Sequence, residues 1–132
     1  MIVDTSAIIA ILREEPQALS CAQAIAQATV RRVSAVSFVE SAVVIDGSRD
    51  PIAARRFDDF MREADIAIEP VTKAQAQIAR DAYRDFGRGS GHRAKLNFGD
   101  CFAYALARES GEPLLFIGDD FAHTDISAAL ST

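Results

Sequence analysis

The amino-acid sequence predicts an α/β protein: a three-layer α/β/α sandwich with a central, mainly parallel sheet. Short apolar segments alternate along the chain with longer segments of helical periodicity, which is typical of a parallel sheet covered by helices. The last strand-like segment, 114–117, is apolar throughout, as expected for a strand buried on both faces. With 132 residues, 49% of them apolar, the chain has the size of one domain, so we expect a single domain over 1–132.

The first half of the chain is expected to contain two strands and four helices. Pro16 suits a first helical turn, and Asp50-Pro51 is a strong helix start, with Asp as N-cap and Pro at the first position. The helix after Pro51 has an apolar stripe at helical spacing, made of Ala53, Phe57, Phe60, Met61 and Ala64. The predicted elements are strand 1–3, helix 5–13, helix 16–28, strand 33–36, helix 37–45 and a helix that begins at 51.

The second half continues the alternation. We expect a strand over 66–69, a helix capped by Thr72, a helix over 100–110 that Gly111 ends, and a strand over 114–117. Segment 125–130 would add an edge strand or a turn. The core face of the helix after Thr72 is predicted to be Ile78, Ala79, Ala82, Tyr83 and Phe86.

Composition narrows the class of protein. The net charge of −5 argues against nucleic-acid binding unless a metal neutralises several of the acids. Cys21 and Cys101 are too few for a disulfide framework or a zinc site and are interpreted as small buried hydrophobes. No apolar stretch approaches the roughly 20 residues of a membrane span, and the N-terminus lacks a signal-peptide pattern, so we expect a cytoplasmic protein without membrane contact.

Acidic residues stand where the predicted strands and loops lead into helices. Asp4 follows the first strand, Glu40 lies near the start of the helix after the second, and Asp100 begins the helix over 100–110. The pair Asp119-Asp120 follows the last strand after Gly118. Because ligands of open α/β sheets bind at the carboxyl ends of the strands, we expect these acids to converge at one edge.

Each acid also has a local structural explanation. Asp4 can cap the helix that follows it, and Asp100 is favoured in a first helical turn by the helix dipole. Ser37 and Glu40 fit the capping box Ser-x-x-Glu. A turn explains one Asp of the pair 119–120 better than it explains two. Capping and metal binding are compatible, since a carboxylate has two oxygens.

Several adjacent carboxylates repel one another, and a divalent cation removes that penalty. Oxygen ligands without neighbouring Cys or His favour Mg²⁺ or Mn²⁺ over zinc, and the waters such an ion keeps can serve as nucleophile in phosphodiester hydrolysis. We therefore expect the converging acids, Asp4, Glu40, Asp100 and the pair Asp119-Asp120, to hold such an ion together.

A basic segment precedes Asp100. Arg88, Arg93 and Lys95 lie on what is predicted to be a flexible, glycine-containing loop near the acidic edge, where they are candidates for contact with phosphate groups. The alternative is a solvated surface loop with no ligand.

Four motifs occur in the order and spacing found in a known family, and together they cover essentially the whole chain: 1–7, 34–40, 96–105 and 115–121. In these motifs the chain resembles PIN-domain ribonucleases, and most closely the VapC-type toxins of bacterial type II toxin–antitoxin systems. The resemblance implies a metal-dependent endoribonuclease that cleaves RNA and arrests translation. It also implies a VapB-like antitoxin that inserts a C-terminal segment into the active site, a homodimer, and a toxin–antitoxin hetero-oligomer that binds its own promoter through the antitoxin.

The resemblance assigns roles by position. Asp4, Glu40 and Asp100 match three acids of the family, and Asp120 matches the fourth. On this match we expect Asp4 and Asp100 to hold the principal Mg²⁺ or Mn²⁺, with Asp120 as a further metal ligand. Glu40 and Asp120 would complete the pocket, and one of the two would orient or deprotonate the attacking water. Arg88, Arg93 and Lys95 would then contact the RNA. The remaining matches are supporting residues: Asp119 as the variable neighbour or alternative ligand, Ser6 as a small polar residue, and Asn97 as a polar residue that orients a ligand or water.

Two other classes of function remain to be weighed. A Mg²⁺-dependent phosphatase also has an Asp after its first strand, but the haloacid-dehalogenase type needs a second Asp two residues later, where this chain has Ser6. A phosphoacceptor receiver domain needs paired acids and a later Lys that are absent here. A non-catalytic PIN-like module that binds RNA or protein is compatible with the fold, although it predicts loss of acids that are all present.

Overall fold

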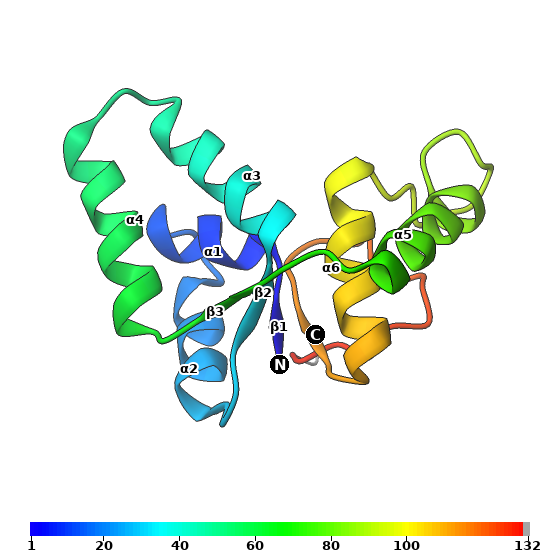
Figure 1. Ribbon diagram of the computed structural model, residues 1–132. Coiled ribbons are helices and arrows are strands. Elements are labelled where there is room, and N and C mark those ends of the chain that lie inside the picture. Colours follow the sequence, from blue (N-terminus) through cyan, green and yellow to red (C-terminus); the bar gives the residue numbers. More distant parts are fainter. Residues whose placement is uncertain (131–132) are drawn as a thin grey trace.

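The computed structural model describes residues 1–130 and has the predicted three-layer architecture (Figure 1). Four strands form an all-parallel sheet in the order β3-β2-β1-β4, with β1 (Ile2–Val3), β2 (Arg32–Ser34), β3 (Ala67–Glu69) and β4 (Leu114–Leu115). Helices α1 (Thr5–Leu12), α2 (Ala18–Gln27), α3 (Ala35–Asp46) and α4 (Pro51–Glu63) pack against one face. Helices α5 (Lys73–Phe86) and α6 (Phe98–Ser110) pack against the other.

Alternating residues of the central strands supply two separate cores. Ile2 and Leu114 belong to the apolar cluster under α5 and α6, whereas Val3 and Leu115 belong to the cluster under α1 to α4. All four side chains are fully buried. The uniformly apolar segments of the sequence therefore reflect a sheet that is covered on both faces.

Most predicted boundaries lie within one or two residues of the observed ones, and the differences have identifiable causes. Helix α2 begins at Ala18 because Pro16 lies in the turn before it. Strand β4 ends at Leu115 because Ile117 N donates to the hydroxyl of Ser6 instead of continuing the ladder. The predicted edge element near the C-terminus is reduced to an isolated bridge between Leu114 and Ala128.

The capping predictions are largely confirmed. Asp50 caps α4 with Pro51 in its first turn, Thr72 caps α5, and Gly111 ends α6 in the left-handed conformation. One core assignment is wrong: Tyr83 is 47% exposed, and Gln75 is buried on α5 instead, bonded to Glu109.

Both cysteines are buried and free, as predicted. Within residues 1–130, no helix is long and apolar enough to cross a membrane.

Candidate metal-dependent nuclease site

Asp4 lies at the carboxyl end of β1, where it is only 5% exposed. Its Oδ2 accepts hydrogen bonds from the backbone N–H of Ser6 at 3.0 Å and from the Ser6 hydroxyl at 2.7 Å, so it is the N-cap of α1. Burial raises the pKa of Asp4, the Ser6 hydrogen bonds oppose that rise, and the charge of Glu40 adds to it. The cap explains the position of Asp4, but it does not remove the electrostatic penalty for a buried carboxylate.

Ser6 connects the ends of two strands. Its hydroxyl donates to Asp4 and accepts the backbone N–H of Ile117 at 2.9 Å, just beyond β4. The side chain therefore fixes the Asp4 carboxylate relative to the segment that leads to Asp119 and Asp120. This contact gives a structural basis for the supporting role predicted for Ser6.

Glu40 lies in the second turn of α3 and not at its start. The helix begins at Ala35 because the Ser34 hydroxyl accepts the N–H of Val36, so the capping box predicted for Ser37 and Glu40 is wrong. Thr5 instead holds the carboxylate, with its hydroxyl 3.1 Å from Glu40 Oε1. Burial raises the pKa of Glu40, the Thr5 hydrogen bond lowers it, and the charge of Asp100 raises it further.

A reciprocal capping box starts α6. Asp100 N donates to Asn97 Oδ1 at 2.8 Å, and Asn97 N donates to Asp100 Oδ2 at 3.0 Å. Asn97, which was expected to orient a ligand or water, thus acts as the N-cap that positions Asp100. The pKa of Asp100 is raised to about 6, first by burial and then by the charges of Asp4 and Asp120, against opposing effects of Asn97 and Arg88.

Gly99 is a site residue that the sequence interpretation missed. A Cβ on Gly99 would lie 2.0 Å from Glu40 Oε2 and 2.3 Å from its carboxyl carbon. The carboxylate of Glu40 therefore lies directly against the backbone of Gly99, in space that any side chain would fill. The only signal in the sequence was its place immediately before a predicted catalytic Asp, just ahead of the helix predicted over 100–110.

Asp119 and Asp120 both lie exposed after Gly118, whose φ is +99°. The charge of Asp120 contributes to the raised pKa of Asp100, whereas Asp119 is not among the groups that affect it. Asp120 also lines a hollow with Arg88 and Lys95, whereas Asp119 does not. Arg93, the third residue predicted to contact RNA, lies outside this hollow. The two adjacent acids are thus distinguishable by their surroundings.

Electrostatic interactions join the four predicted acids into one cluster. Asp4 interacts with Glu40, Glu40 with Asp100, and Asp100 with both Asp4 and Asp120. Figure 1 shows why they meet: the N-terminal ends of α3 and α6 lie at the end of the sheet where β1 terminates. The fold brings together side chains that are far apart in the sequence.

The donor set fits a hard divalent cation by its chemistry. It consists of carboxylates only, of which Asp4, Glu40 and Asp100 have raised pKa values, and the Glu40 carboxylate lies against the backbone of Gly99. Over residues 1–130, no three Asp, Glu, His or Cys side chains already stand close enough together to hold an ion. Asp4, Glu40 and Asp100 are each hydrogen-bonded to a local donor, and their like charges repel. The carboxylates therefore lie near one another without all facing one common point.

A parallel sheet between helical layers, with acids converging at the carboxyl ends of its strands, defines a PIN-type nuclease fold. Residues 1–127 match the PIN domain family. Ribonuclease VapC28 of Mycobacterium tuberculosis is 58% identical over 130 residues, which cover 98% of each chain. Ribonuclease VapC42 of the same species is 47% identical over 129 residues, again 98% of each chain. The chain therefore belongs to the PIN-domain family and, within it, to the VapC ribonucleases.

Solved structures agree with this assignment at the level of the fold. The chain superimposes on the crystal structure of M. tuberculosis VapC20, described as a sarcin-ricin loop cleaving toxin, with a TM-score of 0.71. The superposition covers 95% of both chains, at 19% sequence identity. A toxin–antitoxin complex from Klebsiella pneumoniae covers 94% of this chain and 92% of its own, with a TM-score of 0.65 at 20% identity. The predicted enzyme class, an endoribonuclease toxin of the VapC type, is confirmed, and the alternatives of a phosphatase or a receiver domain are set aside.

Proposed function

We propose that this chain hydrolyses RNA phosphodiester bonds with Mg²⁺, or Mn²⁺ in its place, and thereby inhibits translation. VapC ribonucleases of the PIN family generally depend on a divalent metal. The observation that carries the proposal is the placement of Asp4, Glu40, Asp100 and Asp120 at one end of the sheet, where Ser6, Thr5 and Asn97 orient three of the carboxylates and burial raises the pKa of those three. Their charges are costly in a partly dry site, and a cation offsets that cost.

Asp4, Asp100 and Asp120 are the proposed metal ligands. The bonds from Ser6 use Oδ2 of Asp4, and the bond from Asn97 uses Oδ2 of Asp100, which is compatible with a cation on the second oxygen of each. When bound, such an ion supplies a water of lowered pKa and a positive charge beside the scissile phosphate.

Glu40 is the proposed general base. Thr5 binds its Oε1, so Oε2 is the oxygen that would take the proton of the attacking water. Glu40 is partly buried and burial raises its pKa, which makes its carboxylate a stronger base than a solvated one, whereas Asp120 is exposed. Thr5 and Ser6 act as positioning residues, since each fixes a carboxylate without reaching the reacting atoms.

Three substitutions test this site. Asp4→Asn should abolish metal-dependent RNA cleavage while it leaves the fold intact, because the amide keeps the shape and the cap acceptor. Asp120→Asn should reduce cleavage strongly, whereas Asp119→Asn, one residue away and equally exposed, should leave it unchanged. Cleavage of a purified RNA by nuclease-free preparations, with and without EDTA, measures all three. Full activity of Asp4→Asn would refute the assignment, and equal effects at positions 119 and 120 would refute the choice between the two acids.

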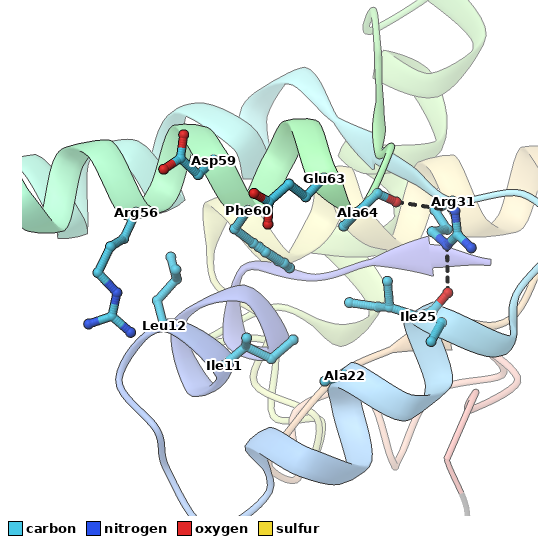
Figure 2. A pocket seen from close by; sticks show the side chains of 11 residues that line it. Ile11, Leu12, Ala22, Ile25, Arg31, Arg56, Asp59, Phe60, Glu63 and Ala64 are labelled. Atoms are coloured by element: carbon cyan, nitrogen blue, oxygen red, sulfur yellow. Dashed lines mark hydrogen bonds between the residues drawn. The ribbon is translucent and has the colours of Figure 1, made fainter.

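A VapB-like antitoxin is the proposed partner, and a groove between α1, α2 and α4 is its proposed docking surface (Figure 2). The groove encloses about 580 Å³, and apolar side chains including Ile11, Leu12, Ile25 and Phe60 line it. Of the stripe predicted on α4, Phe57 and Met61 are buried in the core, whereas Phe60 lies partly exposed in the groove. Charged side chains at its rim, Arg31, Arg56, Asp59 and Glu63, would give a helix or strand of the partner its orientation.

A homodimer and a toxin–antitoxin hetero-oligomer are the proposed assemblies. Two apolar side chains one turn apart on α3, Val39 and Val43, are 56% and 65% exposed, and Phe98 on the neighbouring α6 is 72% exposed. Exposed apolar side chains grouped on adjacent helices are typical of a protein interface. Val39→Lys with Val43→Lys should give a monomer in analytical ultracentrifugation, and an unchanged dimer would exclude this face as the interface.

A further inference from the structure

The loop between α5 and α6 was expected to be flexible, but hydrogen bonds fix its shape. Its two ends are joined, since Arg88 N donates to Leu96 O at 3.0 Å and Leu96 N donates to Phe86 O at 2.9 Å. Ala94 and Leu96 are buried and anchor the returning half of the loop in the core. Basic side chains on this loop therefore project from a defined backbone.

One side of the loop forms a hollow of about 620 Å³ beside the acidic cluster. Arg88, His92, Lys95 and Asp120 line it together with Gly89 and Gly91. A Cβ at either glycine would meet no atom within 4 Å, so the space beside these two residues is open. The hollow adjoins the metal-ligand cluster, because Asp120, one of the proposed ligands, lines it.

The two cations of the hollow are unpaired. Arg84 and Arg108 form ion pairs with neighbouring aspartates, but among the ion pairs of residues 1–130 none involves Arg88 or Lys95. Two unpaired cations next to a cluster of carboxylates attract an anion to the place where the nuclease needs one.

His92 adds a neutral hydrogen-bond donor to this wall. Its Nδ1 accepts the backbone N–H of Ala94 at 3.0 Å, and its ring packs edge-on against Phe86 with centroids 4.9 Å apart. With Nδ1 as acceptor, the neutral ring carries its proton on Nε2. Nε2–H is therefore a donor available to a ligand, held by a ring that cannot turn freely.

We infer that this hollow is a phosphate subsite for the nucleotide adjacent to the scissile bond of the RNA. Arg88 and Lys95 would neutralise the non-bridging oxygens of that phosphate, and His92 Nε2–H would donate a hydrogen bond to one of them. The volume of about 620 Å³ is within the range of about 300–1,000 Å³ of ligand pockets, which leaves room for a phosphate group. The inference rests on the proposed nuclease function and specifies how the substrate is held.

The test measures RNA binding separately from cleavage. A 12-nucleotide single-stranded RNA of mixed sequence is titrated against Asp4→Asn protein at several salt concentrations. In that background, Arg88→Gln and Lys95→Gln should each weaken binding roughly 5- to 10-fold and reduce the slope of log K against log salt by about 0.7. Arg93→Gln is the matched control, since Arg93 lies exposed on the same loop outside the hollow, and it should change neither quantity.

His92 provides a second, independent readout. In His92→Asn, the amide oxygen can still accept the N–H of Ala94, but the Nε2 donor is lost. Binding should weaken roughly 5-fold with an unchanged salt slope, because the lost donor is neutral. Thermal unfolding of each variant checks that the loop remains folded.

The outcomes separate the subsite from the nuclease function. Three results would overturn the subsite. The first is an equal loss of RNA affinity in Arg93→Gln and Arg88→Gln, and the second is unchanged RNA affinity in all the loop variants. The third is no binding of the RNA probe at all. If the wild-type protein cleaves RNA while any of these results is obtained, the subsite alone fails. If it does not cleave RNA but the predicted binding pattern is observed, the nuclease proposal fails and the subsite stands.

Discussion

Gly99→Ala is a sharp test of how the site is built. The new methyl group would lie 2.0 Å from Glu40 Oε2 and 2.4 Å from Oε1, which is less than a van der Waals contact by more than 1 Å. The carboxylate is the flexible end of a side chain, so it would move away and leave the backbone in place. Movement would break its 3.1 Å contact with the Thr5 hydroxyl.

Stability and activity should therefore change in different ways. Gly99 is the second residue of α6 and does not have a positive φ, so alanine is compatible with its backbone. In a helix interior, replacing glycine by alanine gains about 1 kcal/mol of helix propensity; in this first turn the gain is smaller and partly offsets the lost Thr5 hydrogen bond of about 1 kcal/mol. The melting temperature should stay within roughly 4 °C of wild type. Loss of a positioned general base should lower kcat by about 100-fold or more.

A double-mutant cycle with Glu40→Gln distinguishes displacement of Glu40 from general damage. If Gly99→Ala acts through the Glu40 carboxylate, it should add little to the loss that Glu40→Gln already causes in metal-dependent RNA cleavage. Thermal unfolding followed by circular dichroism supplies the stability measurement. Wild-type kcat in Gly99→Ala, or losses that multiply in the double variant, would refute the argument that this glycine exists to accommodate Glu40.

Three further predictions concern the strand ends, the buried charges and the partner. Ser6→Ala should lower the free energy of unfolding by about 1–3 kcal/mol, because Ile117 N–H and the Asp4 carboxylate both lose a hydrogen-bond partner. Urea denaturation measures this loss, and a value below about 0.5 kcal/mol would show that Ser6 does not join the ends of these strands. For metal-free protein, stability should increase as the pH falls from 8 to 5, because a pKa of Asp100 near 6 is above its unfolded value of 3.8 and the stabilising proton is lost as the pH rises through 6. A melting temperature that decreases as the pH is lowered from 8 to 5 would contradict the raised pKa of Asp100. Phe60→Glu should weaken cognate-antitoxin binding at least 10-fold in calorimetry without affecting RNA cleavage, and unchanged affinity would exclude the α1/α2/α4 groove.

The fold was predictable because its signals are local and repeated. Apolar segments such as 114–117, the cap at Asp50 and the stop at Gly111 each specify an element without reference to the rest of the chain. Boundaries were wrong where a distant residue intervened. Strand β4 ends early because Ser6, more than a hundred residues before it, accepts the N–H of Ile117.

The site was predictable as a set of acids but not as an arrangement. Glu40 seemed to belong to a capping box, yet α3 starts at Ala35 and Thr5 holds the carboxylate. Neither Thr5 nor Gly99 carries a chemical signature that identifies it as part of a metal site. Their roles arise from the packing of α3 against α1 and α6, which brings Glu40 against both, and no spacing along the chain encodes that contact.

The hydrogen bonds that fix the carboxylates also explain why these side chains stay separate and oriented near one another. Ser6, Thr5 and Asn97 each bind one oxygen of a different acid and so hold three negative charges apart at fixed positions. The raised pKa values show that this separation does not relieve the penalty completely. This arrangement favours binding of a divalent cation, because the carboxylates are already oriented and their negative charges are already destabilised. The same arrangement disfavours a purely structural role for the acids, since replacing them with neutral residues of similar shape would make the fold more stable.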